Sequence, residues 1–111
     1  MQIAPLLHVG RGVTVIIGGG GKTTLIETLA GELSKKGKVI TTTTTHICRP
    51  KQYETLLDAT EAAVSAALER SGIVCVASQA ESGKLCAPRL SMGTLAQLAD
   101  FVLVEADGAK R

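Results

Sequence analysis

Aromatic residues are nearly missing from this 111-residue chain, which has one tyrosine, one phenylalanine and no tryptophan. A hydrophobic core must therefore be built from valine, isoleucine, leucine and alanine, a composition typical of parallel strands covered by helices. The net charge is only +2, and the chain has no basic run. Because nucleic-acid binding relies on clustered positive charge and on rings that stack on bases, we do not expect nucleic acid as the main partner.

Cysteines and long apolar runs are also scarce. The chain has three cysteines and no C-x-x-C pair, which argues against a disulfide framework or a zinc site. No apolar stretch approaches the roughly 20 residues of a membrane-spanning helix, and the first residues lack the pattern of a secretory signal peptide. We therefore expect a cytoplasmic protein without a membrane partner, whose residues 1–111 form one domain.

The most informative feature present is a glycine-rich loop between an apolar run, Val13–Ile17, and a helical pattern that begins near Leu25. Its residues are Gly18, Gly19, Gly20, Gly21, Lys22, Thr23 and Thr24. Such a loop turns successive backbone N–H groups toward one point, a lysine there adds a mobile positive charge, and the adjacent hydroxyl can reach a magnesium ion. The longer pattern G-x-x-x-x-G-K-[ST] would need glycine in place of Ile16, so the motif present is the shorter G-x-G-G-K-T. We expect the loop to bind nucleotide phosphates, with Lys22 also acting in catalysis and Thr23 as a magnesium ligand.

Strand-like and helix-like apolar patterns alternate along the chain. Strands are expected at residues 13–17, 38–45, 73–77 and 101–104, with a short hairpin strand at 84–87, and helices after the glycine loop, at 58–70 and at 91–99. Asp58 and Glu61 resemble a capping box at the start of the second helix, and Ser91 can cap the third. The run Val13–Ile17 is apolar on both faces and is expected at the centre of the sheet. This alternation predicts a three-layer α/β fold of the P-loop nucleotide-binding type, with a mostly parallel sheet.

Carboxylates follow the last apolar run, Phe101–Val104, in the order Glu105, Ala106, Asp107. In open α/β sheets the ligand crevice lies outside the carboxyl ends of the strands, so these acids are expected to face the phosphate loop. We predict that Glu105 and Asp107 are magnesium ligands, and that Glu105 orients an attacking water. The alternative is that they are solvated residues of a strand end and an Asp-Gly turn.

A run of five threonines, Thr41–Thr45, ends the second expected strand and precedes His46. Threonine favours strands, but valine and isoleucine are expected in a strand adjacent to the first one. Hydroxyls at the carboxyl end of that strand are well placed for a γ-phosphate, a magnesium-bound water or a second substrate. Thr44 and Thr45 are therefore candidate nucleotide-binding residues, whereas His46 is either a ligand or a solvated loop residue.

Three segments together resemble the YqeC family in order and approximate spacing: IIGGGGKTTL, VITTTTTHICRP and VLVEADGAKR. These are P-loop proteins regarded as accessory factors for selenium-dependent molybdenum hydroxylases. The resemblance implies that Gly18–Thr24 bind nucleotide phosphates and that Glu105, Asp107 and Lys110 belong to a signature near the site. Proteins of the family continue well past this signature. We therefore expect residues 1–111 to be the N-terminal part of a longer protein, with a fold that is incomplete at its C-terminus.

The expected function is magnesium-dependent binding of ATP or GTP, with hydrolysis or phosphoryl transfer, in selenium cofactor biosynthesis and the maturation of selenium-dependent molybdenum hydroxylases. Expected partners are such a hydroxylase or its cofactor assembly proteins.

Three alternatives stay open. A metallochaperone-type maturation GTPase would be favoured by an N-K-x-D motif, which these residues lack. An ATP-dependent ligase or kinase would fit the similarity of the short glycine loop to that of the Mur ligases. A non-catalytic switch module would bind nucleotide without turnover.

Overall fold

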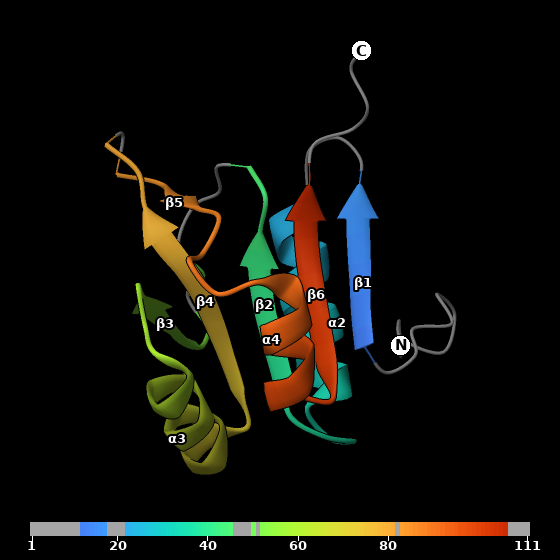
Figure 1. Ribbon diagram of the computed structural model, residues 1–111. Helices are drawn as coiled ribbons and strands as arrows, with labels where there is room; N and C mark the ends of the chain where they lie inside the picture. The colour runs from blue at the N-terminus through green and yellow to red at the C-terminus, as the bar shows by residue number, and fades with distance from the viewer. Residues whose placement is uncertain (1–11, 18–21, 46–49, 51, 82, 107–111) are drawn as a thin grey trace.

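The computed structural model describes residues 12–17, 22–45, 50, 52–81 and 83–106 of the chain. These ranges contain six strands and three helices (Figure 1). In chain order they are β1 (Gly12–Ile17), α2 (Lys22–Leu33), β2 (Val39–Thr43), β3 (Glu54–Leu57), α3 (Glu61–Ser71), β4 (Ile73–Gln79), β5 (Leu85–Cys86), α4 (Met92–Leu98) and β6 (Phe101–Ala106). Every strand and helix expected from the sequence is present, and β3 is an additional strand.

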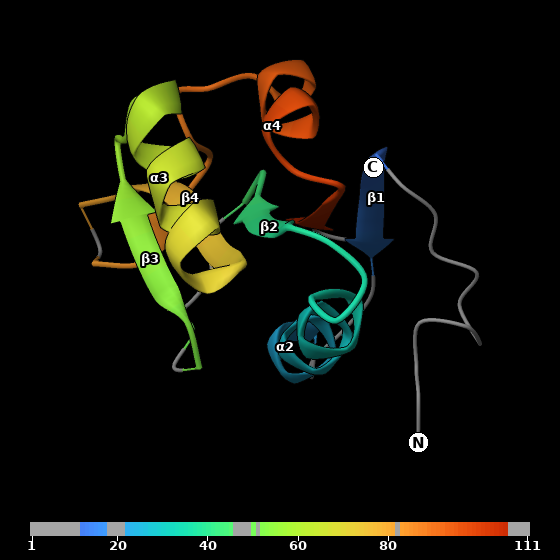
Figure 2. The ribbon, with the colours of Figure 1, turned by 90° about the horizontal axis from the view of Figure 1, so that it is seen from below.

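The strands form one sheet in the order β1-β6-β2-β4-β3, and all of these neighbours are parallel. The short β5 pairs antiparallel with the end of β4. Helix α2 covers one face of the sheet, whereas α3 and α4 cover the other (Figure 2). The predicted three-layer α/β architecture with a mostly parallel sheet is therefore confirmed, and it suits a P-loop-type protein.

The core consists of aliphatic layers on the two faces of the sheet, because successive residues of a strand point to opposite sides. On the α2 face, Val39 and Leu103 pack against Leu29 and its helical neighbours. On the opposite face, Ile40 and Val102 belong to the cluster that includes residues of α3 and α4. Burial on both faces explains why β6 is continuously apolar from Phe101 to Val104, as expected for an interior parallel strand. β2 is buried throughout as well, although its last three residues are threonines.

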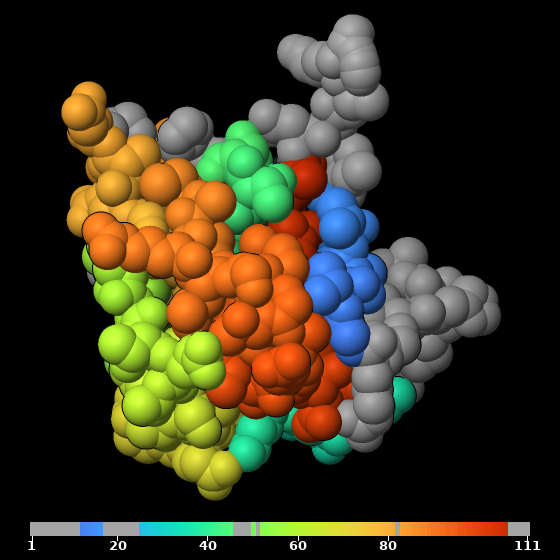
Figure 3. Space-filling view, viewed as in Figure 1, coloured from blue at the N-terminus to red at the C-terminus, as the bar shows by residue number. Residues whose placement is uncertain are grey.

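Two sequence predictions about strand position are wrong. β1 was expected at the centre of the sheet, but it is an edge strand that pairs, within the described ranges, with β6 alone. Its Val13 and Val15 are 42% and 50% exposed, and β1 lies at the surface beside α4 in Figure 3. β2 was expected next to β1, but β6 lies between them because the chain crosses from β4 through α4 back to that position. An apolar run cannot reveal this order, which is set by the crossovers.

The start of α3 differs from the predicted capping box. Thr60 is the N-cap residue, and its side-chain oxygen accepts a hydrogen bond from the backbone N of Ala63 at 3.2 Å. Asp58 instead has a positive φ of 52° and accepts a hydrogen bond of 2.6 Å from Ser78 Oγ. The side chain of Asp58 therefore joins the ends of β3 and β4 and does not cap the helix. The expected cap of α4 by Ser91 is confirmed.

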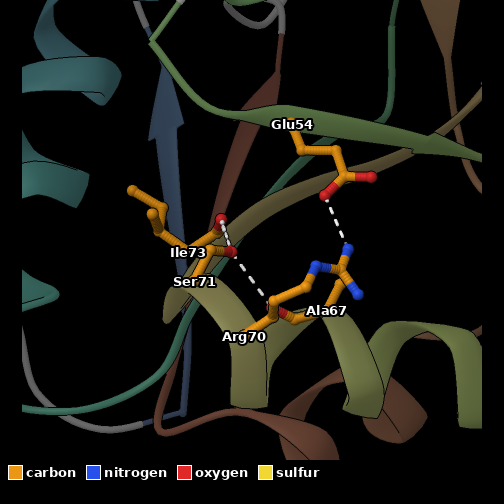
Figure 4. A network of polar contacts seen from close by, with 5 residues as sticks. All are labelled: Glu54, Ala67, Arg70, Ser71 and Ile73. Carbon is orange, nitrogen blue, oxygen red and sulfur yellow. Dashed lines mark hydrogen bonds and ion pairs between the residues drawn. The ribbon is translucent and has the colours of Figure 1, made fainter.

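A polar network fixes the other end of α3 to the sheet (Figure 4). Arg70 Nη2 lies 2.9 Å from Glu54 Oε1, at the start of β3. Ser71 Oγ lies 3.0 Å from Ala67 O and 3.2 Å from Ile73 O, at the start of β4. These contacts lie at the amino ends of β3 and β4, whereas a phosphate site is expected at the carboxyl ends of the strands. They therefore hold α3 against the sheet and do not belong to that site.

Candidate functional site at the carboxyl edge of the sheet

The carboxyl end of β1 leads through the glycine-rich loop directly into α2, which begins at Lys22. The backbone of Lys22, Thr23 and Thr24 therefore forms the first turn of a 12-residue helix. The first N–H groups of a helix have no partner within it, and the helix dipole favours an anion there. Gly18, Gly19, Gly20 and Gly21 lie outside the described residues. The strand–loop–helix context that the phosphate-loop motif requires is present.

Glu105 lies at the carboxyl end of β6, between the two strands that carry the other candidate residues. In the sheet register it is the partner of Ile16 on β1 and of Thr43 on β2. Glu105 is buried, with 6% of its surface exposed. By alternation along β6 it lies on the face of Phe101 and Leu103, which is the face that α2 covers. Asp107, the second predicted acid, lies outside the described residues.

Thr44 and Thr45 follow β2 and are connected to Glu105 through the backbone. The backbone N of Thr44 donates to Glu105 O at 3.1 Å, and Thr43 Oγ1 donates to the same oxygen at 2.9 Å. The backbone N of Thr45 donates to Thr43 Oγ1 at 3.0 Å. The structure thus brings Thr44 and Thr45 beside Glu105, with Thr44 exposed and Thr45 half-buried. His46 lies outside the described residues.

Tyr53, which precedes β3, is a residue near the candidate site that the sequence did not reveal. It packs beside the apolar clusters of the α2 face. The pKa of its phenol is raised well above the ordinary value, mainly by burial. The nearby Thr41 hydroxyl partly offsets this rise, whereas the charges of Cys75, Glu27 and Glu105 add to it. Glu27 and Glu105 thus both lie close enough to affect the phenol. The only signal in the sequence was that this is the single tyrosine of a chain poor in aromatics.

A resident metal cluster is not found in the part of the chain that the structure describes: no group of three or more His, Cys, Asp or Glu side chains there could hold a metal ion. Magnesium beside a nucleotide needs no such cluster, because it takes one or two protein ligands and completes its shell with phosphate oxygens and waters. One buried carboxylate, Glu105, at the edge reached by α2 fits that donor set. Within the same described ranges, no helix is both long and apolar enough to cross a membrane.

The parallel sheet, the strand–loop–helix unit with its G-x-G-G-K-T motif and the acid on the neighbouring strand define an α/β protein with P-loop-type architecture. The family model described as YqeC protein matches residues 14–111. Because this match spans most of the chain, the chain belongs to the YqeC family, as its three motifs indicated. No curated protein and no solved structure matches it.

Proposed function

We propose that this protein binds a purine nucleoside triphosphate with magnesium at the carboxyl edge of the sheet and hydrolyses it or transfers its terminal phosphoryl group. The observation that carries the proposal is the position of β6 between β1 and β2, which makes Glu105 the register partner of Ile16, next to the glycine-rich loop. Phosphate-binding and acidic groups on adjacent strand ends are what phosphoryl transfer needs, because the protein chiefly positions the reactants and stabilises charge.

Each candidate residue has a distinct role in this proposal. The backbone N–H groups at the start of α2 and the Lys22 ammonium hold the phosphates, while Thr23, Glu105 and Asp107 are the residues that would hold magnesium. Magnesium held there would supply positive charge to neutralise the phosphate oxygens. Glu105 also orients the attacking water or acceptor, and the polar groups of Thr44 and Thr45 contact the terminal phosphate or a second substrate. The nucleotide proposed is ATP or GTP.

The cellular role proposed is the maturation of selenium-dependent molybdenum hydroxylases, within selenium cofactor biosynthesis. It is supported by membership of the YqeC family. The partners proposed are a molybdenum hydroxylase or the proteins that assemble its cofactor. A non-catalytic switch would show saturable nucleotide binding without release of phosphate, so turnover assays separate it from an enzyme.

Binding of fluorescent ATP and GTP analogues, with magnesium and with a chelator, tests the proposal directly. Lys22→Ala should weaken triphosphate binding by about 1.5–3 kcal/mol, because a charge-assisted contact with the phosphates is lost. Binding of adenosine or guanosine should not change. Lys35→Ala is the matched control, because Lys35 is an exposed lysine just past the opposite end of α2. Equal losses for triphosphate and nucleoside would show that the loop serves the fold and not the phosphates.

A further inference from the structure

The hydroxyl group of Thr43 connects two backbone segments, the residues that follow β2 and the end of β6. It donates a hydrogen bond to Glu105 O at 2.9 Å and accepts one from the backbone N of Thr45 at 3.0 Å. Thr43 itself is the last residue of β2 and is fully buried, with 0% of its surface exposed. A valine would fill the same space in a strand but could make neither bond. The preference of threonine for strands therefore does not by itself explain a hydroxyl at this position.

The two bonds fix the backbone on either side of the candidate site. Glu105 O accepts from Thr43 Oγ1 and also from the backbone N of Thr44 at 3.1 Å. A carbonyl that accepts from two donors fixes the peptide plane between Glu105 and Ala106, at the end of β6. The bond from Thr45 fixes the first residues after β2. The segment after β2 and the end of β6 are thereby held as one unit.

We propose that Thr43 is a positioning residue of the nucleotide site, whose hydroxyl couples the segment after β2 to the backbone of Glu105. The inference rests on the proposed function and adds to it a residue that contacts no ligand itself, since full burial excludes contact. A shift of Thr45 toward a bound phosphate would strain its bond to Thr43 and, through the same hydroxyl, alter the setting of Glu105. Binding of a phosphate beside Thr45 and the position of Glu105 are therefore coupled.

The adjacent residue provides a matched control. Thr42 Oγ1 also donates to a backbone carbonyl, Val76 O at 2.6 Å, and Thr42 is 1% exposed. Because successive residues of a strand alternate, its side chain points to the opposite face of the sheet from that of Thr43, and its bond is to β4 and not to β6. Thr42→Val and Thr43→Val therefore remove the same chemical group at similar depth in the same strand. Only Thr43→Val removes the two hydroxyl bonds, to Glu105 O and from Thr45 N, and it leaves the backbone bond from Thr44 N to Glu105 O in place.

The experiment compares wild type, Thr43→Val, Thr43→Ser and Thr42→Val in the 111-residue chain. Three quantities are measured: the free energy of unfolding, hydrogen exchange of the Thr45 amide without nucleotide, and magnesium-dependent affinity for a fluorescent nucleoside triphosphate. Thr43→Val should increase Thr45 exchange and reduce the affinity about tenfold, which corresponds to about 1.4 kcal/mol. Thr43→Ser keeps the hydroxyl and should restore both. Thr42→Val should lower stability as much as Thr43→Val does, with affinity within about twofold of wild type.

The outcomes separate this inference from the proposed function. Failure of the wild type to bind any triphosphate would refute the proposed function, and the positioning role with it, whatever the exchange result. Wild-type binding with equal affinity losses in Thr42→Val and Thr43→Val would refute the positioning role alone, because the loss would then follow stability. Faster Thr45 exchange in Thr43→Val without a loss of affinity would also refute it, since the link would then be broken without consequence for the site.

Discussion

Gly37 lies so close to Asp100 that a Cβ atom at position 37 would be 2.3 Å from Asp100 Oδ2 and 2.9 Å from Asp100 Cβ. The same carboxylate accepts a hydrogen bond from the backbone N of Lys38 at 2.8 Å, and the backbone N of Asp100 donates to Lys38 O at 2.9 Å. These contacts join the start of β2 to the start of β6. They therefore fix the neighbour relation that, at the opposite end of the strands, places Glu105 beside Thr43.

The first prediction is that Gly37→Ala destabilises the fold by about 1–3 kcal/mol, because the new Cβ would displace the Asp100 side chain from its bond to Lys38 N. Denaturant titration measures this change. Gly31→Ala is the control: no neighbour lies within 4 Å of its added Cβ, and it should stabilise α2 by roughly 0.5–1 kcal/mol. Equal stability of Gly37→Ala and wild type would mean that the Asp100 side chain can move aside without any loss in the free energy of unfolding.

The second prediction separates magnesium binding from strand-end solvation. Glu105→Gln keeps the shape of the side chain and removes its charge, so folding should change little while magnesium-dependent triphosphate binding or turnover falls at least tenfold. Binding is measured with and without a chelator. Asp107→Asn is tested in parallel, since either acid is a candidate ligand. If both variants keep the magnesium dependence of the wild type, the acids are not part of a metal site.

The third prediction concerns Tyr53, whose pKa is raised above its ordinary value mainly by burial. Because the folded state then holds the phenol proton more tightly than the unfolded chain, the free energy of unfolding should fall as the pH rises above about 10. The absorbance of ionised phenol reports Tyr53 alone, since it is the only tyrosine. It should show no ionisation of the folded protein near pH 10.

Tyr53→Phe is the control for that measurement. It should abolish the part of the pH dependence that sets in above about pH 10, because no phenol remains to ionise on unfolding. A folded wild-type protein whose phenol titrates at the ordinary value would contradict the packing of the half-buried Tyr53 against the α2 face. A pH dependence that is the same in both proteins would assign it to other groups.

The fourth prediction concerns the exposed edge of the sheet. Strand β6 has a neighbour on each side, β1 and β2, and therefore offers no free edge. The exposed apolar edge among the described residues is β1, with Val13 and Val15. Residues 1–111 should therefore self-associate through β1, and the double variant Val13→Thr/Val15→Thr should associate less while its stability changes by only about 0.5 kcal/mol.

Light scattering across a concentration series, with denaturant titration of both proteins, decides this prediction. A wild-type protein that stays a monodisperse monomer at all concentrations would show that the β1 edge does not cause self-association. Association that persists unchanged in the double variant would place the contact elsewhere on the surface.

Local features of the sequence were sufficient to place most of the helices and strands. The leucines of α2 repeat at helical spacing, Ser91 caps α4 and Gly72 ends α3 with a φ of 80°. Each of these signals acts over one or two turns, so it is readable without knowing the rest of the fold. β3 was missed because its four residues, Glu54–Leu57, form no distinct apolar alternation, and β3 is held by pairing with β4.

The sequence by itself determined the α/β class, the glycine-rich loop between a strand and a helix, the acids at the end of β6 and the family to which the chain belongs. Only the tertiary structure decided that β6 lies between β1 and β2, that β1 is an edge strand, and that Thr43 bonds to both Glu105 and Thr45. The physical reason for this division is the distance along the chain over which each interaction acts. Periodicity and caps depend on residues a few positions apart, whereas Thr43 and Glu105 are 62 positions apart and meet only when the crossovers have set the strand order.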